Sequence, residues 1–131
     1  MAEQMDFTLR IELNDDDRSL KDILALYSGR IRDDLDETAW NLCNSDDALQ
    51  AEKFSDLDMK DYKLEHKAGE GYIIHAAFSV SAESEDFIEE VVSDWMNGFE
   101  YHIMPAVNGV YSRTGKKGLA PSLSSWEVFF Q

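Results

Sequence analysis

Residues 62–81 read YKLEHKAGEGYIIHAAFSVS, and this stretch decides the fold. Apolar and polar residues alternate on both sides of the Gly-containing segment 68–71. Period-2 alternation around a short glycine-containing connection predicts a β-hairpin. We expect its strands over 62–66 and 72–81. One face of the second strand is apolar and carries Tyr72, Ile74, Ala76, Phe78 and Val80.

A strand and a helix are expected before the hairpin. Residues 7–13 alternate Phe, Leu, Ile and Leu with polar residues, which predicts a half-buried strand. Apolar residues at helical spacing then predict a helix near 18–28, ending at Ser28-Gly29 or continuing through Leu35. Residues 30–58 have no clear period, and we expect short helices there. Their apolar anchors are Trp40, Leu42, Leu49 and Phe54.

A second helix follows the hairpin. Ser84 is expected to cap it and Asn97-Gly98 to end it. Residues 100–104 and 126–130 are predicted to be strands, with the Gly-rich, mildly basic loop 112–118 between them. The helix has a single apolar stripe, formed by Phe87, Ile88, Val91, Val92, Trp95 and Phe99.

The expected order of elements is strand, helix, strand, strand, helix, strand. The fourth strand is placed at 100–104, with a tail after it and an insertion before the central hairpin. This order predicts an α+β fold, the ferredoxin-like β-α-β-β-α-β antiparallel sheet with its helices on one face. The length favours one domain over residues 1–131.

The charge of the chain is strongly negative. It has 27 Asp plus Glu against 12 Lys plus Arg, a net charge of -15. Such a field repels nucleic acid and anionic membrane and attracts cationic surfaces. At 44% hydrophobic residues the chain can still build a core. A single cysteine, with neither a signal-peptide pattern nor an apolar run of about 18 residues, predicts a soluble cytoplasmic protein.

Motifs for metal, phosphate or thiol chemistry are incomplete. The acidic turn 14–17 lacks the Gly and Glu that a calcium loop needs at its sixth and twelfth positions, so we expect it to cap a helix. Cys43 stands among acids, which raise the pKa of a thiol. The segment 115–118 lacks the Walker spacing of a phosphate loop.

The three histidines do not form a recognisable site. A symmetrical hairpin connection pairs His66 with Tyr72 and Lys63 with His75, which places the two histidines on opposite faces of the sheet. Histidines on opposite faces cannot share a metal ion. His102 has no partner at metal-binding spacing. We therefore expect no catalytic residues, no cofactor and no metal site.

Two acidic runs remain as candidate partner-binding residues. Carboxylates along an exposed helix can imitate part of the phosphate array of DNA, and Arg and Lys of a basic groove would bind them by charge-assisted hydrogen bonds. A solvated, charge-rich face is the alternative interpretation of either run. The first run comprises Glu83, Glu85, Asp86, Glu89, Glu90 and Asp94. The second comprises Asp33, Asp34, Asp36, Glu37, Asp46, Asp47, Asp56, Asp58 and Asp61.

In size, acidity and missing catalytic motifs the chain is similar to phage- and plasmid-encoded anti-defence proteins, such as anti-CRISPR and anti-restriction proteins, and to immunity proteins against nuclease toxins. No diagnostic family motif covers any part of it. This similarity implies a small inhibitor that mimics nucleic acid and occupies the basic surface of a nuclease or nucleic-acid-binding complex. The inhibitor itself would bind neither nucleic acid nor membrane. Exposed aromatics such as Trp40 or Tyr111 would anchor the contact.

Two other functions stay open from the sequence. One is a structural or regulatory module that forms a homodimer through a sheet edge or face, with an apolar patch at Trp126, Val128, Phe129 and Phe130. The same residues are also expected as a closing strand of the core. The other is a small cleft enzyme without a recognisable motif, which would need a pocket with converging polar groups.

Overall fold

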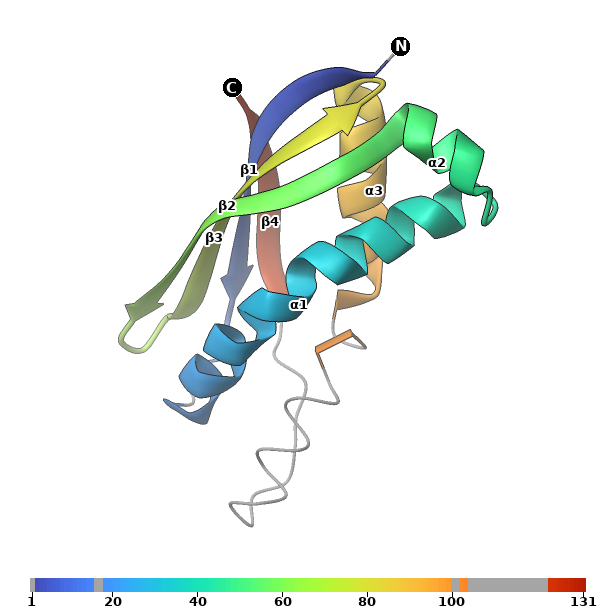
Figure 1. Ribbon diagram of the computed structural model, residues 1–131. Helices are drawn as coiled ribbons and strands as arrows, with labels where there is room; N and C mark the ends of the chain where they lie inside the picture. The colour runs from blue at the N-terminus through green and yellow to red at the C-terminus, as the bar shows by residue number, and fades with distance from the viewer. Residues whose placement is uncertain (1, 16–17, 100–101, 104–122) are drawn as a thin grey trace.

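The computed structural model describes residues 2–15, 18–99, 102–103 and 123–131. Figure 1 shows the strands side by side with the long helices packed against them. The elements in chain order are β1 (Glu3–Leu13), α1 (Arg18–Leu42), α2 (Asp47–Lys53), β2 (Phe54–Lys67), β3 (Gly71–Ala82), α3 (Glu85–Asn97) and β4 (Leu123–Phe130).

The sheet has the strand order β2-β3-β1-β4, and every neighbouring pair is antiparallel. The chain passes from β1 through α1 to β2 with β3 between these strands, and from β3 through α3 to β4 with β1 between them. This is the ferredoxin-like arrangement. The predicted fold class is therefore confirmed, with the short helix α2 as the insertion before the hairpin.

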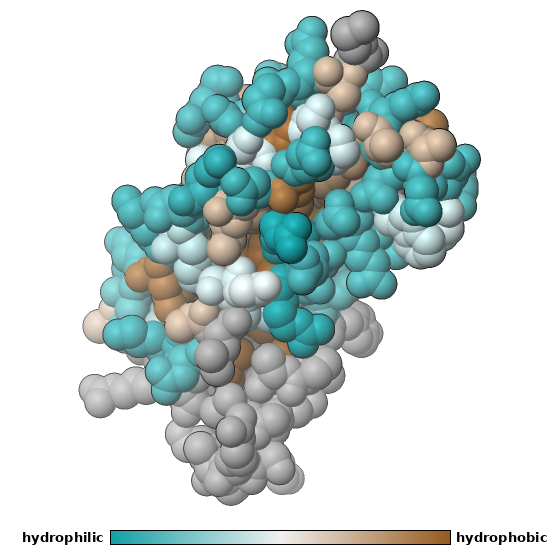
Figure 2. All heavy atoms as spheres, in the orientation of Figure 1, coloured by the Kyte–Doolittle hydropathy of each residue, from teal (hydrophilic) through white to brown (hydrophobic). Residues whose placement is uncertain are grey.

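The helices leave one face of the sheet uncovered. Buried residues alternate along β1, and the partner strand β3 is buried on the same side. The apolar stripes of α1 and α3 join that side in one hydrophobic cluster. Figure 2 shows hydrophilic side chains over most of the described surface on the side of α1. Each helix thus separates a wholly apolar inner stripe from a polar outer one.

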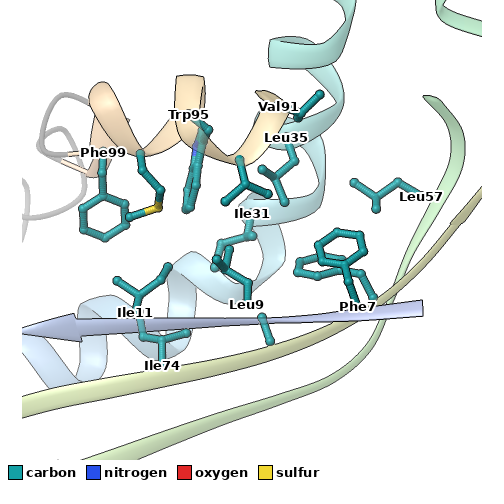
Figure 3. Close-up of a cluster of buried hydrophobic side chains, with 14 of the residues drawn as sticks. Phe7, Leu9, Ile11, Ile31, Leu35, Leu57, Ile74, Val91, Trp95 and Phe99 are labelled. Carbon is teal, nitrogen blue, oxygen red and sulfur yellow. The ribbon is translucent and has the colours of Figure 1, made fainter. Parts of the chain in front are cut away.

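Aromatic and branched side chains fill the core between sheet and helices (Figure 3). The rings of Phe7 on β1 and Phe78 on β3 stack at a centroid distance of 5.2 Å. Trp95 of α3 meets Phe99 edge to face at 5.4 Å. All four side chains are at most 1% exposed. Burial of rings of this size contributes about 1.5–3 kcal/mol each, so these side chains stabilise the core that the sheet and the helices share.

The hairpin register is as predicted, with His66 opposite Tyr72 and Lys63 opposite His75. The first hairpin strand is longer than expected, because β2 begins at Phe54 and includes two irregularities in its pairing with β3. Asp56 lies at the first irregularity with φ of 55°. These interruptions hide the period-2 pattern upstream of residue 62.

Helix α1 is longer than predicted. Of the short helices expected over residues 30–58 the structure has α2, while the second half of α1 and the start of β2 occupy most of the remaining segment. Ile31, Leu35 and Ala39 are fully buried and continue the spacing of the helix past Gly29. Gly29 itself has open space around its α-carbon. The burial of the next two turns therefore outweighs the local preference of this glycine for a turn.

The predicted fourth strand at residues 100–104 is wrong. His102 and Ile103 are helical, and the amide N–H of His102 donates to the carbonyl oxygen of Gly98 at 3.0 Å. Ile103 follows Phe99 by one helical turn and is fully buried, so the apolar stripe of α3 continues here. The fourth strand is β4, and the basic loop 112–118 lies outside the described residues.

Substitution of Gly71 tests how closely the hairpin approaches β1, and substitution of Gly29 in α1 serves as the comparison. A Cβ on Gly71 would overlap the carbonyl oxygen of Leu13, and this glycine has φ of +117°. We expect Gly71→Ala to lower the free energy of unfolding by about 2–4 kcal/mol. Gly29→Ala should instead raise it by about 0.5–1 kcal/mol, because Gly29 is in a helix and meets nothing. Urea unfolding followed by circular dichroism measures both changes. Equal unfolding midpoints for the two variants would contradict the close contact between Gly71 and Leu13.

Candidate acidic interface

The outer face of α3 is entirely acidic. The hydroxyl oxygen of Ser84 accepts a hydrogen bond from the amide of Phe87 at 3.1 Å and caps the helix, as predicted. Six helical residues on the opposite side are buried. The exposed carboxylates are those of Glu83, Glu85, Asp86, Glu89, Glu90 and Asp94. Within the described part of the chain, no Lys or Arg forms an ion pair with any of them.

The charge density of this helix is close to that of a DNA strand. Residues 85–94 hold five carboxylates, and ten helical residues span about 15 Å. The helix therefore presents one negative charge per about 3 Å, against about 3.4 Å for one strand of DNA. Asp86, Glu90 and Asp94 follow one another on one side at intervals of about 6 Å.

Only some of these acids are placed where they stabilise the helix. Glu85 and Asp86 in the first turn interact favourably with the helix dipole. Asp94 lies in the last turn, where the dipole disfavours an acid and no base is present. Like charges four residues apart, as in Asp86 and Glu90, each destabilise the helix by about 0.2–0.5 kcal/mol. The acidic face is thus maintained against a local energetic cost.

The second acidic run is divided by the structure. Asp33, Asp36 and Glu37 are exposed on α1, and Asp46 and Asp47 are exposed at the start of α2. The carboxylate of Asp46 caps α2 by accepting from the amides of Ala48 and Leu49. The remaining members of the run, Asp56, Asp58 and Asp61, lie on β2 instead.

The end of α2 connects the acids of α1 to those of α3. The amide of Glu83 donates to the carbonyl oxygen of Lys53 at 3.0 Å. The Lys53 ammonium lies over the ring of Phe87, 5.4 Å from its centroid. Both runs also surround Cys43, whose thiol has a pKa raised first by burial and further by Asp46, Glu83 and Glu90. We call residues 33–53 and 83–94 the acidic helical surface.

Two predicted binding residues of α1 also have structural partners. The Tyr27 hydroxyl donates to the half-buried carboxylate of Asp34, and burial, followed by this carboxylate, raises the pKa of Tyr27. Gln50 of α2 donates its side-chain amide to the carboxylate of Asp36 at 3.0 Å. These bonds fix the inner edge of the acidic helical surface, and the more exposed carboxylates remain open to a partner.

Trp40 is the exposed aromatic of this surface, with 37% of its side chain accessible. Its indole N–H donates to the carboxylate of Asp47 at 2.7 Å, which holds the ring between α1 and α2. A fixed ring flanked by carboxylates can pack against an Arg or Lys side chain and its aliphatic stem. Tyr111, the other expected anchor, lies outside the described residues.

The uncovered face of the sheet has mixed charge. Lys60 pairs with Asp58 at 2.8 Å and Lys63 approaches Asp61 at 3.7 Å. On α1, Asp33 likewise pairs with Arg32 at 2.8 Å, so three acids of the second run have cationic neighbours. Arg10 pairs with Glu12 on β1. The sequence contains a signal for this difference, because Lys60, Lys63 and Lys67 recur along β2, whereas α3 has no base.

The sites weighed from the sequence lie apart from one another. His66 stacks on Tyr72 at 4.5 Å, while His75 lies on the other face with Glu65 at 3.6 Å. His102 stacks near Trp95 at 6.3 Å. Cys43 is buried. Of the acidic turn 14–17, Asp16 and Asp17 lie outside the described residues.

Hollows among the described residues lie away from the acidic helical surface or are open to solvent. A hollow of about 110 Å³ lies beside the hairpin turn and is lined by Glu12, Lys67, Glu70 and Tyr72, among others. A wider one of about 370 Å³ lies on the uncovered sheet face at Lys63 and His75. A third hollow of about 230 Å³ lies on the acidic helical surface and is lined by Asp36, Asp47 and Gln50, among others, but it is open to solvent. The acidic helical surface is therefore exposed and accessible to a macromolecule.

None of the described helices is both long and apolar enough to cross a membrane. No protein-family model and no curated protein matches the chain. Among solved structures, a de novo designed protein with a ferredoxin fold, determined by solution NMR, is similar to it. The two are 8% identical with a TM-score of 0.32, over 98% of this chain and 82% of the designed one. That similarity is loose, and the fold assignment rests on the strand order and pairing described above.

The carboxyl of Asp36 gives this surface a pH dependence. Burial raises its pKa, with a further contribution from Asp33. Because the pKa is raised on folding, the ionised form lowers stability at neutral pH, and the loss disappears as the pH falls through the raised pKa. We expect Asp36→Asn to raise the free energy of unfolding by up to about 0.5 kcal/mol at neutral pH. The gain should vanish in acid, as measured by thermal unfolding at several pH values. A gain that persists there would contradict this origin.

Proposed function

We propose that this protein binds a basic, nucleic-acid-binding surface of a partner protein and inhibits the partner by occupying that surface. The acidic helical surface makes the contact and stands in for the phosphates of a nucleic acid. The partner belongs to the class of nucleases and nucleic-acid-binding complexes, as in anti-CRISPR, anti-restriction and nuclease-immunity systems. The proposed activity is binding rather than catalysis.

The observation that carries the proposal is the uneven distribution of charge. Residues 33–53 hold seven acids and residues 83–94 hold six, against Lys53 as the one base of both segments. The rest of the chain holds the other 14 acids with 11 bases and is nearly neutral. A solvated surface needs no such concentration, since interspersed charges maintain solubility equally well.

The physical basis of binding is electrostatic complementarity at an exposed surface. The carboxylates of α3, which form no ion pair with a described Lys or Arg, can accept charge-assisted hydrogen bonds from a partner's Arg and Lys without first breaking a salt bridge. Steering by the field speeds association at low salt, and screening weakens it at high salt. Trp40, placed among the carboxylates of α1 and α2, supplies the apolar contact that a charged surface alone lacks.

The first experiment identifies the partner and the nature of the contact. The immobilised protein is incubated at low salt with a lysate of the cells that produce it, and bound proteins are identified by mass spectrometry. We expect one stoichiometric, nucleic-acid-binding partner, released by raised salt and displaced by duplex DNA or RNA. A partner that salt and nucleic acid both leave bound would contradict the proposal.

The second experiment locates the contact by charge reversal. The variant Glu89→Lys, Glu90→Lys, Asp94→Lys should weaken binding of the captured partner by at least about 100-fold at low salt. Its fold should persist, because Glu89→Lys and Glu90→Lys place bases four residues from Glu85 and Asp86, and Asp94→Lys places a base in the last turn, where the helix dipole favours it. Affinity is measured by biolayer interferometry, with circular dichroism to verify folding.

A matched control variant shows whether binding depends on the position of the reversed charges or only on the net charge of the protein. The variant Asp6→Lys, Asp61→Lys, Glu65→Lys changes the net charge equally, but its residues are exposed on the uncovered sheet face. We expect it to weaken binding by less than about fivefold, through long-range steering alone. Equal losses in the two variants would show that net charge, and not the acidic helical surface, determines binding.

A further inference from the structure

The two edges of the sheet differ in how they are protected. An edge strand presents unpaired backbone N–H and C=O groups, and proteins block such edges with charges, bulges and irregular pairing. Strand β2 has all three: seven of its 14 residues are charged, and its pairing with β3 is interrupted at two places. Charges of this kind prevent β2 from pairing with another strand.

Strand β4 has less of this protection, although its pairing with β1 is irregular at one place, between Glu12 and Leu13. Its sequence is LSSWEVFF, with Glu127 as its single charged residue. Aromatic and β-branched residues of this kind favour strand pairing. Among the residues that the structure describes, β4 has β1 on one side and no strand on the other. Over residues 123–130 it therefore offers one backbone edge for an added strand.

The apolar side chains of β4 are also incompletely covered. Trp126, Val128 and Phe130 face the helices but are only half-buried, whereas their partners on β1 (Ile11, Leu9 and Phe7) are at most 1% exposed. Phe129 points to the uncovered face with 47% of its side chain accessible. An added strand with a similar apolar row would complete the burial of these residues.

The charge distribution favours a second copy of the chain, rather than a basic partner, at the β4 edge. A basic partner is attracted to the acidic helical surface, whereas β4 carries only Glu127, which lies opposite Arg10 of β1. This edge is locally almost neutral in a chain of net charge -15. The pairing of two copies at this edge therefore brings few charges of β4 together, and salt screens the remaining repulsion between the two anionic chains. Antiparallel pairing of β4 with β4 about a two-fold axis lets identical strands satisfy each other.

We propose that the protein forms a two-fold symmetric homodimer through the β4 edge, which joins two sheets into one of eight strands. This dimer is independent of the proposed partner binding, because the acidic helical surface and the β4 edge use different residues. The two interactions also respond oppositely to salt. Salt screens the repulsion between two anionic copies and strengthens the dimer, but it weakens contact with a basic partner.

The test is sedimentation velocity of the full chain over a concentration series at low and high salt. We expect a monomer–dimer equilibrium that shifts towards dimer at high salt. Phe129→Asp should raise the dissociation constant at least about tenfold, since it places two like charges at the symmetric edge. Ala68→Asp, at the exposed hairpin turn, adds the same charge away from β4 and should leave the constant unchanged.

A second measurement does not depend on any variant. Amide hydrogen exchange at low and high protein concentration should show concentration-dependent protection in residues 123–130 and none in β2. A monomer up to about 1 mM at high salt would overturn the proposal. So would a dimer that is insensitive to Phe129→Asp, or one whose protection lies in β2 or the helices.

Discussion

The structure depends on the burial of one face of the sheet under α1 and α3. The apolar residues of β1 and β3 all point to that face, and the stack of Phe7 on Phe78 lies within it. Both helices turn a mainly apolar stripe inward, with Thr38 of α1 as a buried polar exception. Their described carboxylates lie on the outer faces or, as for Asp34, half-buried at the edge. The position of the acidic helical surface follows from this packing, since the carboxylates have no inward position to occupy.

That surface is more acidic than the fold requires. The ferredoxin-like arrangement needs polar outer faces but no particular sign of charge, and the sheet face with Arg10, Lys60 and Lys63 mixes both signs. On α3 the chain instead places an acid where the helix dipole opposes it. An acid that lowers the stability of its own helix suggests a role outside folding. The negative charge favours binding to a basic surface of a partner as that role.

The sequence predicted the elements with clean periodicity and missed those where tertiary contacts override local signals. The hairpin register, the cap at Ser84 and the exposed acids of α3 follow from spacing alone. The continuation of α1 past Gly29 depends on burial against the sheet, which no local pattern shows. The strand expected at residues 100–104 is a second case, because Ile103 packs one helical turn after Phe99 and is fully buried. The sequence did not show that the second acidic run is divided between α1, α2 and β2, because the start of β2 at Phe54 was not predicted.

Carbodiimide cross-linking of the captured complex tests the central claim most directly, because it joins carboxylates to partner lysines only where they touch. If the acidic helical surface makes the contact, we expect cross-linked peptides that contain Glu85, Glu89, Glu90 or Glu37, together with lysines of the partner's nucleic-acid-binding surface. Links confined to Asp58, Asp61 and Glu65 on the sheet, or to partner lysines remote from its nucleic-acid site, would contradict it.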